Sequence, residues 1–224
     1  MPRASDVPRF AIVFALLIAI YSAGEALDGQ PWAALVFLPL VYSATAVAFH
    51  ELGFARRVLA ANAVAMLATY GLAFAGSLSG AEGLVAPGLG LAALYAVASA
   101  VLLLRHVLIA TQATGNVVFA ALSVYLLLGV IFAIFYTQVA AVDPAAFSPE
   151  QTAADSSLYY FSFITLTTVG FGDIVPAVDW LRAATVLEGL LGQIFLVVLV
   201  ARLVGLQVAQ HARSTPTTPP EGRE

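Results

Sequence analysis

Long apolar segments separated by short polar ones run along the whole chain. Six of them are apolar on every side, as expected of helices that cross a bilayer, which takes about 20 residues. They cover residues 10–24, 32–49, 58–76, 88–104, 117–139 and 180–206. Because lipid offers the backbone no hydrogen-bond partners, each segment is predicted to be a transmembrane helix.

Composition agrees with this pattern. Of the 224 residues, 61% are hydrophobic and 10% are charged, whereas a soluble domain carries about 25% charged residues. A soluble enzyme, a disordered chain and a disulfide scaffold (the chain has no Cys) are therefore excluded. The formal net charge of −4 gives no indication of a nucleic-acid partner.

The distribution of arginine predicts the topology. All nine basic residues are Arg, and if the N-terminus is cytoplasmic only Arg182 falls outside. This is the positive-inside pattern for an even number of spans, so we expect a multi-pass protein of the plasma membrane with both termini in the cytoplasm. The first span, preceded by Arg3 and Arg9, is also compatible with a cleaved signal peptide, but the arginine distribution favours its retention.

The segment between the last two spans differs from an ordinary loop. Asp155, Ser156 or Ser157 can cap a helix, and about ten apolar and aromatic residues follow, too few to cross a bilayer. The sequence after them is Thr168-Val-Gly-Phe-Gly-Asp173. Because non-helical backbone at membrane depth must be covered by protein or line a water-filled cavity, we expect a re-entrant half-helix followed by an extended strand.

Two glycines in that strand have a physical role. Gly170 and Gly172 alternate with Val169 and Phe171, and glycine enters left-handed backbone without a Cβ penalty. Alternating backbone hands can point successive carbonyls to one side. Several copies around an axis would stack rings of oxygens that replace the water shell of a monovalent cation, with the hydroxyl of Thr168 as a further ring.

Thr168-Val-Gly-Phe-Gly is similar to the potassium-channel signature, and the resemblance extends over about residues 117–208. It implies a homotetramer to which each chain contributes a pore helix and a selectivity-filter loop. It implies K⁺ bound by the carbonyls of Thr168, Val169, Gly170 and Phe171, with no cofactor and no enzymatic activity. The expected fold is thus an all-α membrane protein with six transmembrane helices, a re-entrant pore helix and a filter loop.

The chain departs from the commonest signature at two places. Phe171 stands where Tyr is usual, so the hydroxyl that braces the filter is missing. Some relatives carry a carboxylate behind the filter, and Ile164 takes that position here. Filter support is therefore expected from Thr167 and Asp173, with Tyr159 or Tyr160 bonded to Asp173.

By the same resemblance, the last span is the inner helix of the pore. Gly192 fits a hinge, although close helix packing at a small residue explains it equally well. One helical face is expected to line the cavity and form an apolar gate: Gln193, Leu196, Val197, Val200 and Val204.

Glu188 is the only carboxylate deep in a span, and such groups are functional candidates. It lies on a different face from Gln193. We expect it to pack against the pore helix and accept hydrogen bonds from Ser162, Thr165 or Thr185, as a brace. Arg202, near the inner end, is expected to extend to the lipid headgroups.

The predicted domains are a cytoplasmic tail (1–9), a four-helix membrane domain (10–113), a pore domain (114–208) and a disordered cytoplasmic tail (209–224). A voltage sensor needs several Arg or Lys residues in its fourth span, but here only Arg105 follows at its end. Steep voltage gating is therefore not expected. Lipids or an unidentified regulatory partner could control opening, and three predicted cytoplasmic histidines could respond to pH: His50, His106 and His211.

Two alternatives to a potassium channel stay open. A weakly selective monovalent cation channel would use the same filter chemistry. A secondary transporter is disfavoured, because it would need paired intramembrane charges and two repeated halves.

Overall fold

The computed structural model describes residues 10–26, 42–43, 45–50, 53, 56–79, 85–151 and 157–214, which are mostly helical. Its helices are α1 (Phe10–Ala26), α3 (Arg56–Ser79), α4 (Val85–Ile109), α5 (Gly115–Val142), α6 (Ser157–Leu166) and α7 (Asp179–Ser214). A 3₁₀ turn, η2 (Pro144–Ala146), and two short strands, β1 (Phe147–Ser148) and β2 (Val175–Pro176), complete the described elements.

Three of the described helices are long and apolar enough to cross a membrane, over Gly90–Ile109, Gly115–Val142 and Asp179–Ala212. They correspond to the last three predicted spans. The first and third predicted spans are helical as α1 and α3. Most of the second lies outside the described residues, although 42–43 and 45–50 are helical. The structure thus fits an all-α membrane protein, and the six-span count stays a prediction.

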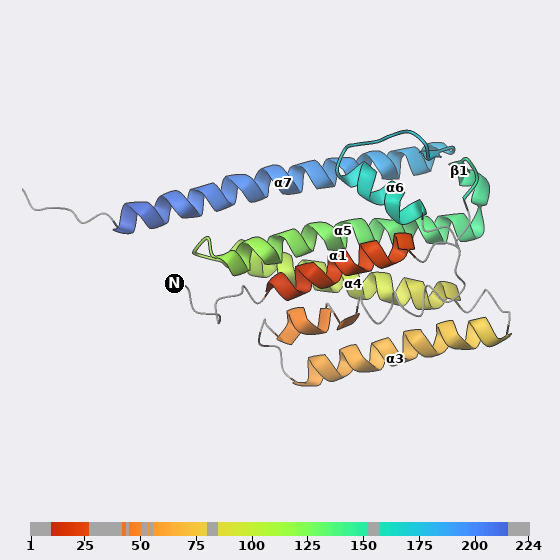
Figure 1. The fold of residues 1–224 in the computed structure, drawn as a ribbon, viewed down its shortest axis with the longest axis horizontal. Coiled ribbons are helices and arrows are strands. Elements are labelled where there is room, and N and C mark those ends of the chain that lie inside the picture. Colours follow the sequence, from red (N-terminus) through yellow and green to blue (C-terminus); the bar gives the residue numbers. More distant parts are fainter. Residues whose placement is uncertain are drawn as a thin grey trace, which may run out of the picture.

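Helix α5 is the centre of the fold. It packs against α4 and α1 on one side and against α6 on the other, while α6 also contacts α7 (Figure 1). The core on its first side consists mostly of buried apolar side chains from α1, α4 and α5, and Leu199 of α7 also belongs to it. Figure 1 shows α3 on the far side of α4 from α5, so α6 and α7 lie opposite α3, whereas α1 also contacts α6.

A five-residue connection joins α4 to α5, and a side-chain cap starts the second helix. The hydroxyl of Thr114 accepts a hydrogen bond from the backbone N–H of Val117 at 3.4 Å, which satisfies one of the unpaired donors at the helix N-terminus. The short connection keeps α4 beside the α5 of its own chain.

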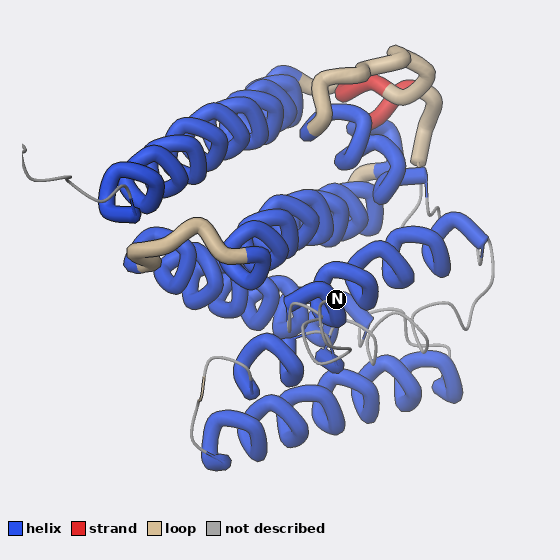
Figure 2. The backbone as a smooth tube through the Cα atoms, turned by 60° about the vertical axis from the view of Figure 1, so that its left-hand side comes forward, coloured by secondary structure: helices blue, strands red, loops and turns tan. Residues whose placement is uncertain are grey.

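The strands and the loops around α6 lie together at one end of the molecule (Figure 2). Strands β1 and β2 pair antiparallel, with Phe147 opposite Pro176 and Ser148 opposite Val175. Around them a second core forms from Tyr136, Phe161 and other apolar residues. This small ribbon fixes the chain that follows residues 168–173.

Helix α7 is longer than the predicted last span. It continues to Ser214, so 209–214, which the sequence analysis assigned to a disordered tail, are helical. The apolar pattern ends near Leu206, but the residues up to Ser214 include neither Gly nor Pro and allow the helix to continue. The rest of the predicted tail, 215–224, lies outside the described residues.

Candidate functional site

The strand that carries the signature begins with the C-terminal cap of α6. The backbone N–H of Val169 donates to the carbonyl of Ile164 at 2.8 Å, and that of Thr168 donates to the carbonyl of Thr165 at 2.9 Å. This pair of bonds is the Schellman motif, in which the residue after the helix takes a left-handed conformation. Helix α6 therefore sets the position of the first residue of the signature.

The backbone alternates in hand through the signature. Thr168 has a φ of 61°, Gly170 of 53° and Gly172 of 78°, and Val169 and Phe171 between them have no positive φ. The two glycines adopt the conformation that the sequence analysis expected of them. At Thr168, a β-branched residue, the left-handed conformation costs roughly 1–2 kcal/mol, which the helix cap has to offset.

The side chains of both threonines are anchored. The hydroxyl of Thr167 donates to the carbonyl of Phe163 at 2.6 Å, and Nε2 of Gln193, on α7, donates to Oγ1 of Thr168 at 3.4 Å. Gln193 was expected to line the cavity, and it lies at hydrogen-bond distance from the first signature residue. Helix α7 and the signature thus meet directly at this point.

Tyr160 also supports the signature. Its hydroxyl donates to Oδ2 of Asp173 at 2.7 Å, and its ring stacks on Phe171 with the ring planes 4° apart. Of the two tyrosines considered for this bond, the structure thus selects Tyr160, while Tyr159 packs against the core of α1, α4 and α5. One residue of α6 therefore holds both the ring and the carboxylate of the signature.

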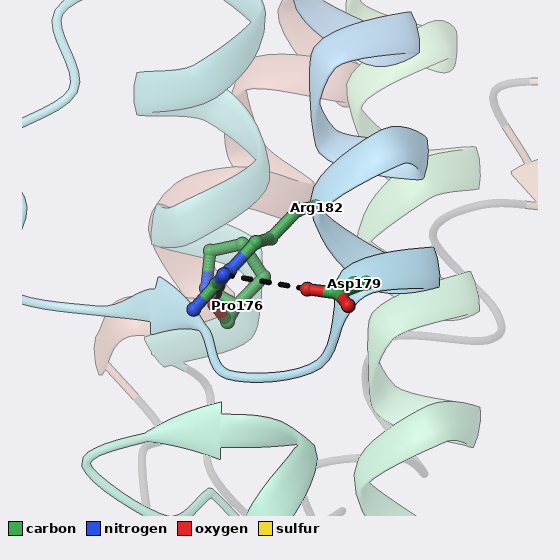
Figure 3. Close-up of polar contacts among 3 residues, drawn as sticks. All are labelled: Pro176, Asp179 and Arg182. Carbon is green, nitrogen blue, oxygen red and sulfur yellow. Dashed lines mark hydrogen bonds and ion pairs between the residues drawn. The ribbon is translucent and has the colours of Figure 1, made fainter.

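Beyond the signature, β2 leads to the start of α7. Figure 3 shows Arg182 reaching back from the first turns of α7: its Nε donates to the carbonyl of Pro176 at 3.1 Å, and its Nη1 lies 3.4 Å from Oδ1 of Asp179. The N–H of Ala177 also donates to the carbonyl of Ala146 at 2.7 Å. These bonds fix the chain between the signature and α7.

Helix α6 fits between α5 and α7 at two glycines. A Cβ atom added at Gly192 would lie 2.6 Å from the carbonyl oxygen of Leu166, and one added at Gly129 would lie 2.8 Å from the ring of Phe163. The hydroxyl of Tyr125 on α5 donates to the same Leu166 carbonyl at 3.1 Å. The geometry at Gly192 supports close packing, and its role as a hinge stays a prediction.

The predicted cavity face of α7 is largely exposed in the single chain. Val197 is 66% exposed, Val200 59% and Val204 52%, while Leu196 is half-buried and Gln193 is exposed. No group of three or more Asp, Glu or His side chains able to hold a metal is found in the described part of the chain.

Glu188 is fully buried, and its carboxyl lies within hydrogen-bond distance of two hydroxyls: that of Ser162, as expected, and that of Tyr136, which was not among the expected partners. The hydroxyl of Thr185 instead donates to a carbonyl of its own helix. Tyr136 lies 52 positions earlier, and a tyrosine hydroxyl within an apolar span is the signal that could have identified it.

Arg202 differs from its expected orientation towards lipid headgroups. Its guanidinium donates to three carbonyls at the C-terminal end of α4: to Val107 at 3.2 Å, to Ala110 at 3.0 Å and to Leu108. A helix C-terminus has unpaired carbonyls and a negative dipole end, so the cation is held there.

Residues 120–207 match a family model described as an ion channel. No curated protein and no solved structure gives a significant match to the chain. The family match covers about two-fifths of the chain and spans α6, the signature and most of α5 and α7. It supports an ion channel domain in a membrane and passive ion conduction.

Proposed function

We propose that the chain is the pore-forming subunit of a potassium-selective channel, a homotetramer in which residues 168–172 of each subunit form one quarter of the filter. The observation that carries the proposal is the alternation of backbone hand along Thr168-Val-Gly-Phe-Gly, directly after the cap of a ten-residue helix. Carbonyl rings that replace hydration water are the known physical basis of K⁺ selectivity.

Exposure supports the assembly. Residues 167–173 are exposed in the single chain, Val169 at 53% and Phe171 at 71%, and non-helical backbone at membrane depth must be covered by protein or line a water-filled cavity. Three further copies around a common axis supply that cover and complete the rings. The exposed face of α7 that includes Val197, Val200 and Val204 then borders the central path as an apolar gate.

The remaining features follow from the same assembly. K⁺ binds at Thr168, Val169, Gly170 and Phe171, and Asp173 with Tyr160 supports the filter from behind. The six-span subunit lies in the plasma membrane with both termini in the cytoplasm. Since the fourth span lacks a series of arginines, opening is not steeply voltage-dependent.

One observation favours a weakly selective monovalent cation channel as a second candidate. Phe171 is held behind the filter by stacking on Tyr160 and has no hydroxyl with which to form a hydrogen bond. Stacking tolerates small displacements more readily than a directional bond, so the carbonyl rings could adjust to Na⁺.

Flux from proteoliposomes tests the proposal. Vesicles loaded with K⁺ should release it through the wild-type protein, and replacement of K⁺ by Na⁺ should abolish the flux if the filter is selective. Gly170→Ala should abolish conduction, because Ala is strained at a φ of 53°. Gly53→Ala is the matched control, since Gly53 also has a positive φ (74°) and open space around it but lies outside the filter.

The outcomes separate the candidates. Equal K⁺ and Na⁺ flux, lost in Gly170→Ala, would indicate the weakly selective channel. Flux that is unaffected by Gly170→Ala, or a purified protein that is monomeric or dimeric, would contradict both.

A further inference from the structure

The buried carboxyl of Glu188 joins three helices behind the filter segment. Glu188 on α7, Tyr136 on α5 and Ser162 on α6 are each 0% exposed. The hydroxyl of Tyr136 donates to Oε2 of Glu188 at 2.7 Å, and Oγ of Ser162 lies 2.5 Å from Oε1. Ser162 Oγ also lies 2.8 Å from the carbonyl oxygen of Gly129 on α5.

A count of hydrogens constrains this cluster. The hydroxyl of Ser162 has one hydrogen, and two acceptor oxygens lie within hydrogen-bond distance of it. If Ser162 donates to Gly129, its contact with Glu188 needs a hydrogen on the carboxyl. A protonated Glu188 supplies that hydrogen, and a single directed chain then runs from Tyr136 to Glu188 to Ser162 to the carbonyl of Gly129, with every contact satisfied.

The surroundings offer no positive charge to stabilise an ionised carboxylate. No Arg or His side chain in the described ranges is recorded within ion-pair distance of Glu188, and its hydrogen-bond partners there are two neutral hydroxyls. An isolated buried charge is far more costly than a neutral group with satisfied hydrogen bonds. The environment and the hydrogen count therefore agree.

We infer that Glu188 is a positioning residue for the filter: as a neutral carboxylic acid it links Tyr136 to Ser162 and so fixes the pore helix against the outer and inner helices. The inference rests on the proposed function, because the filter is the element being positioned. Ser162 lies six residues before Thr168 on α6, and Gly192, one turn after Glu188, contacts the end of the same helix. A displacement of α6 would therefore move the first carbonyls of the filter.

This arrangement takes the place of the missing brace. At the position where some potassium channels carry a carboxylate in the pore helix, this chain has Ile164. Here the carboxyl comes from the inner helix and binds Ser162 in the middle of the pore helix. The filter is thereby connected mechanically to α7, the helix that carries the proposed gate.

Four variants test the role. Glu188→Gln keeps a neutral group that accepts from Tyr136 and donates to Ser162, so it should retain the K⁺/Na⁺ permeability ratio within about twofold. Glu188→Leu, Tyr136→Phe and Ser162→Ala each break the chain and should lower that ratio severalfold, measured from reversal potentials under bi-ionic conditions. A permeability ratio that is retained with Gln and lowered with Leu distinguishes a neutral, hydrogen-bonded brace from a residue that merely fills space.

Matched controls are available on α5. Thr137→Val and Ser123→Ala each remove a buried hydroxyl that bonds only to a carbonyl of its own helix, and both should keep the wild-type ratio. The protonated carboxyl should also give a C=O stretching band in the infrared spectrum of the purified protein, and Glu188→Gln should remove it.

Three results would overturn the inference. The first is a Glu188→Gln protein that misfolds or loses selectivity as Glu188→Leu does. The second is that Tyr136→Phe and Ser162→Ala fold and keep the wild-type permeability ratio. The third is that Glu188→Gln removes no band from the infrared spectrum. Failure of the proposed function is distinguishable, because the wild-type protein would then give no K⁺ flux. The infrared measurement would still decide the state of Glu188.

Discussion

Helix α7 is held to the rest of the subunit in two different ways at its two ends. Near the filter, Glu188 forms hydrogen bonds with hydroxyls of α5 and α6, and Gly192 allows α6 to approach closely. Fourteen residues after Glu188, or about 21 Å along the helix, Arg202 donates to the C-terminal carbonyls of α4. The first attachment is neutral and dry, and the second is charged and partly exposed.

The difference follows from the environment of each end. A group buried at membrane depth is stable only when it is neutral or fully paired. A guanidinium near the water interface keeps part of its hydration and finds a helix terminus of opposite sign. We therefore expect the attachment at Glu188 and Gly192, the upper attachment, to determine the filter geometry. The attachment at Arg202, the lower attachment, should determine the position of the gate and have little effect on the filter.

The largest expected effect comes from Gly192→Ala, at the upper attachment. The added Cβ would lie 2.6 Å from the Leu166 carbonyl oxygen, a backbone atom that moves only if α6 moves. K⁺ flux from proteoliposomes should be lost or lowered by at least about tenfold, since overpacking typically costs 1–3 kcal/mol.

Gly205→Ala on the same helix is the control, since a Cβ atom there has open space. Normal K⁺ flux in Gly192→Ala would show that α6 tolerates the shift and would remove the steric basis of the upper attachment. A lowered open probability with unchanged selectivity would instead favour the hinge role of Gly192.

Arg202→Gln should give the next largest effect, at the lower attachment. It removes charge-assisted bonds to α4, each worth about 1.5–3 kcal/mol when well formed. The inner end of α7 is then free to move towards the pore axis, where the apolar residues Val200 and Val204 of four chains can pack together. Single-channel recording in planar bilayers should show an open probability lower by about tenfold and an unchanged K⁺/Na⁺ permeability ratio.

Arg105→Gln on α4 is the control, because it removes an exposed arginine near the same interface. A changed permeability ratio in Arg202→Gln would contradict the separation of roles between the two ends.

The sequence predicted helices α5, α6 and α7 and the backbone conformation of the signature more fully than it predicted the attachments. Helical periodicity and the signature motif are local features. They were therefore sufficient to predict α5, α6 and α7 and the conformations of Gly170 and Gly172. Ser162 could be predicted as a partner of Glu188 as well, because it lies on the side of the predicted pore helix that faces Glu188.

The contacts that were missed join segments far apart in the chain. Tyr136 is 52 residues from Glu188, and the α4 carbonyls are more than 90 residues from Arg202. Periodicity identifies which face of a helix is buried but not where two helices cross, and the crossing point decides which side chains meet. The sequence also left open whether Tyr159 or Tyr160 bonds to Asp173, because both follow the same cap and differ only in the direction they face.

The smallest expected effect is that of Tyr160→Phe, which extends the comparison to an attachment nearer to water. It removes the 2.7 Å bond to Asp173 but keeps the ring that stacks on Phe171. Because this bond is exposed, it is worth about 0.5–1.5 kcal/mol at most, and the K⁺/Na⁺ permeability ratio should fall by less than about threefold. In Tyr160→Ala, which also loses the ring, the permeability ratio should fall further. If Tyr160→Phe instead lowered selectivity more than Tyr136→Phe does, burial would not be what sets the strength of these attachments, and the contrast between the dry and the hydrated end of α7 would have to be abandoned.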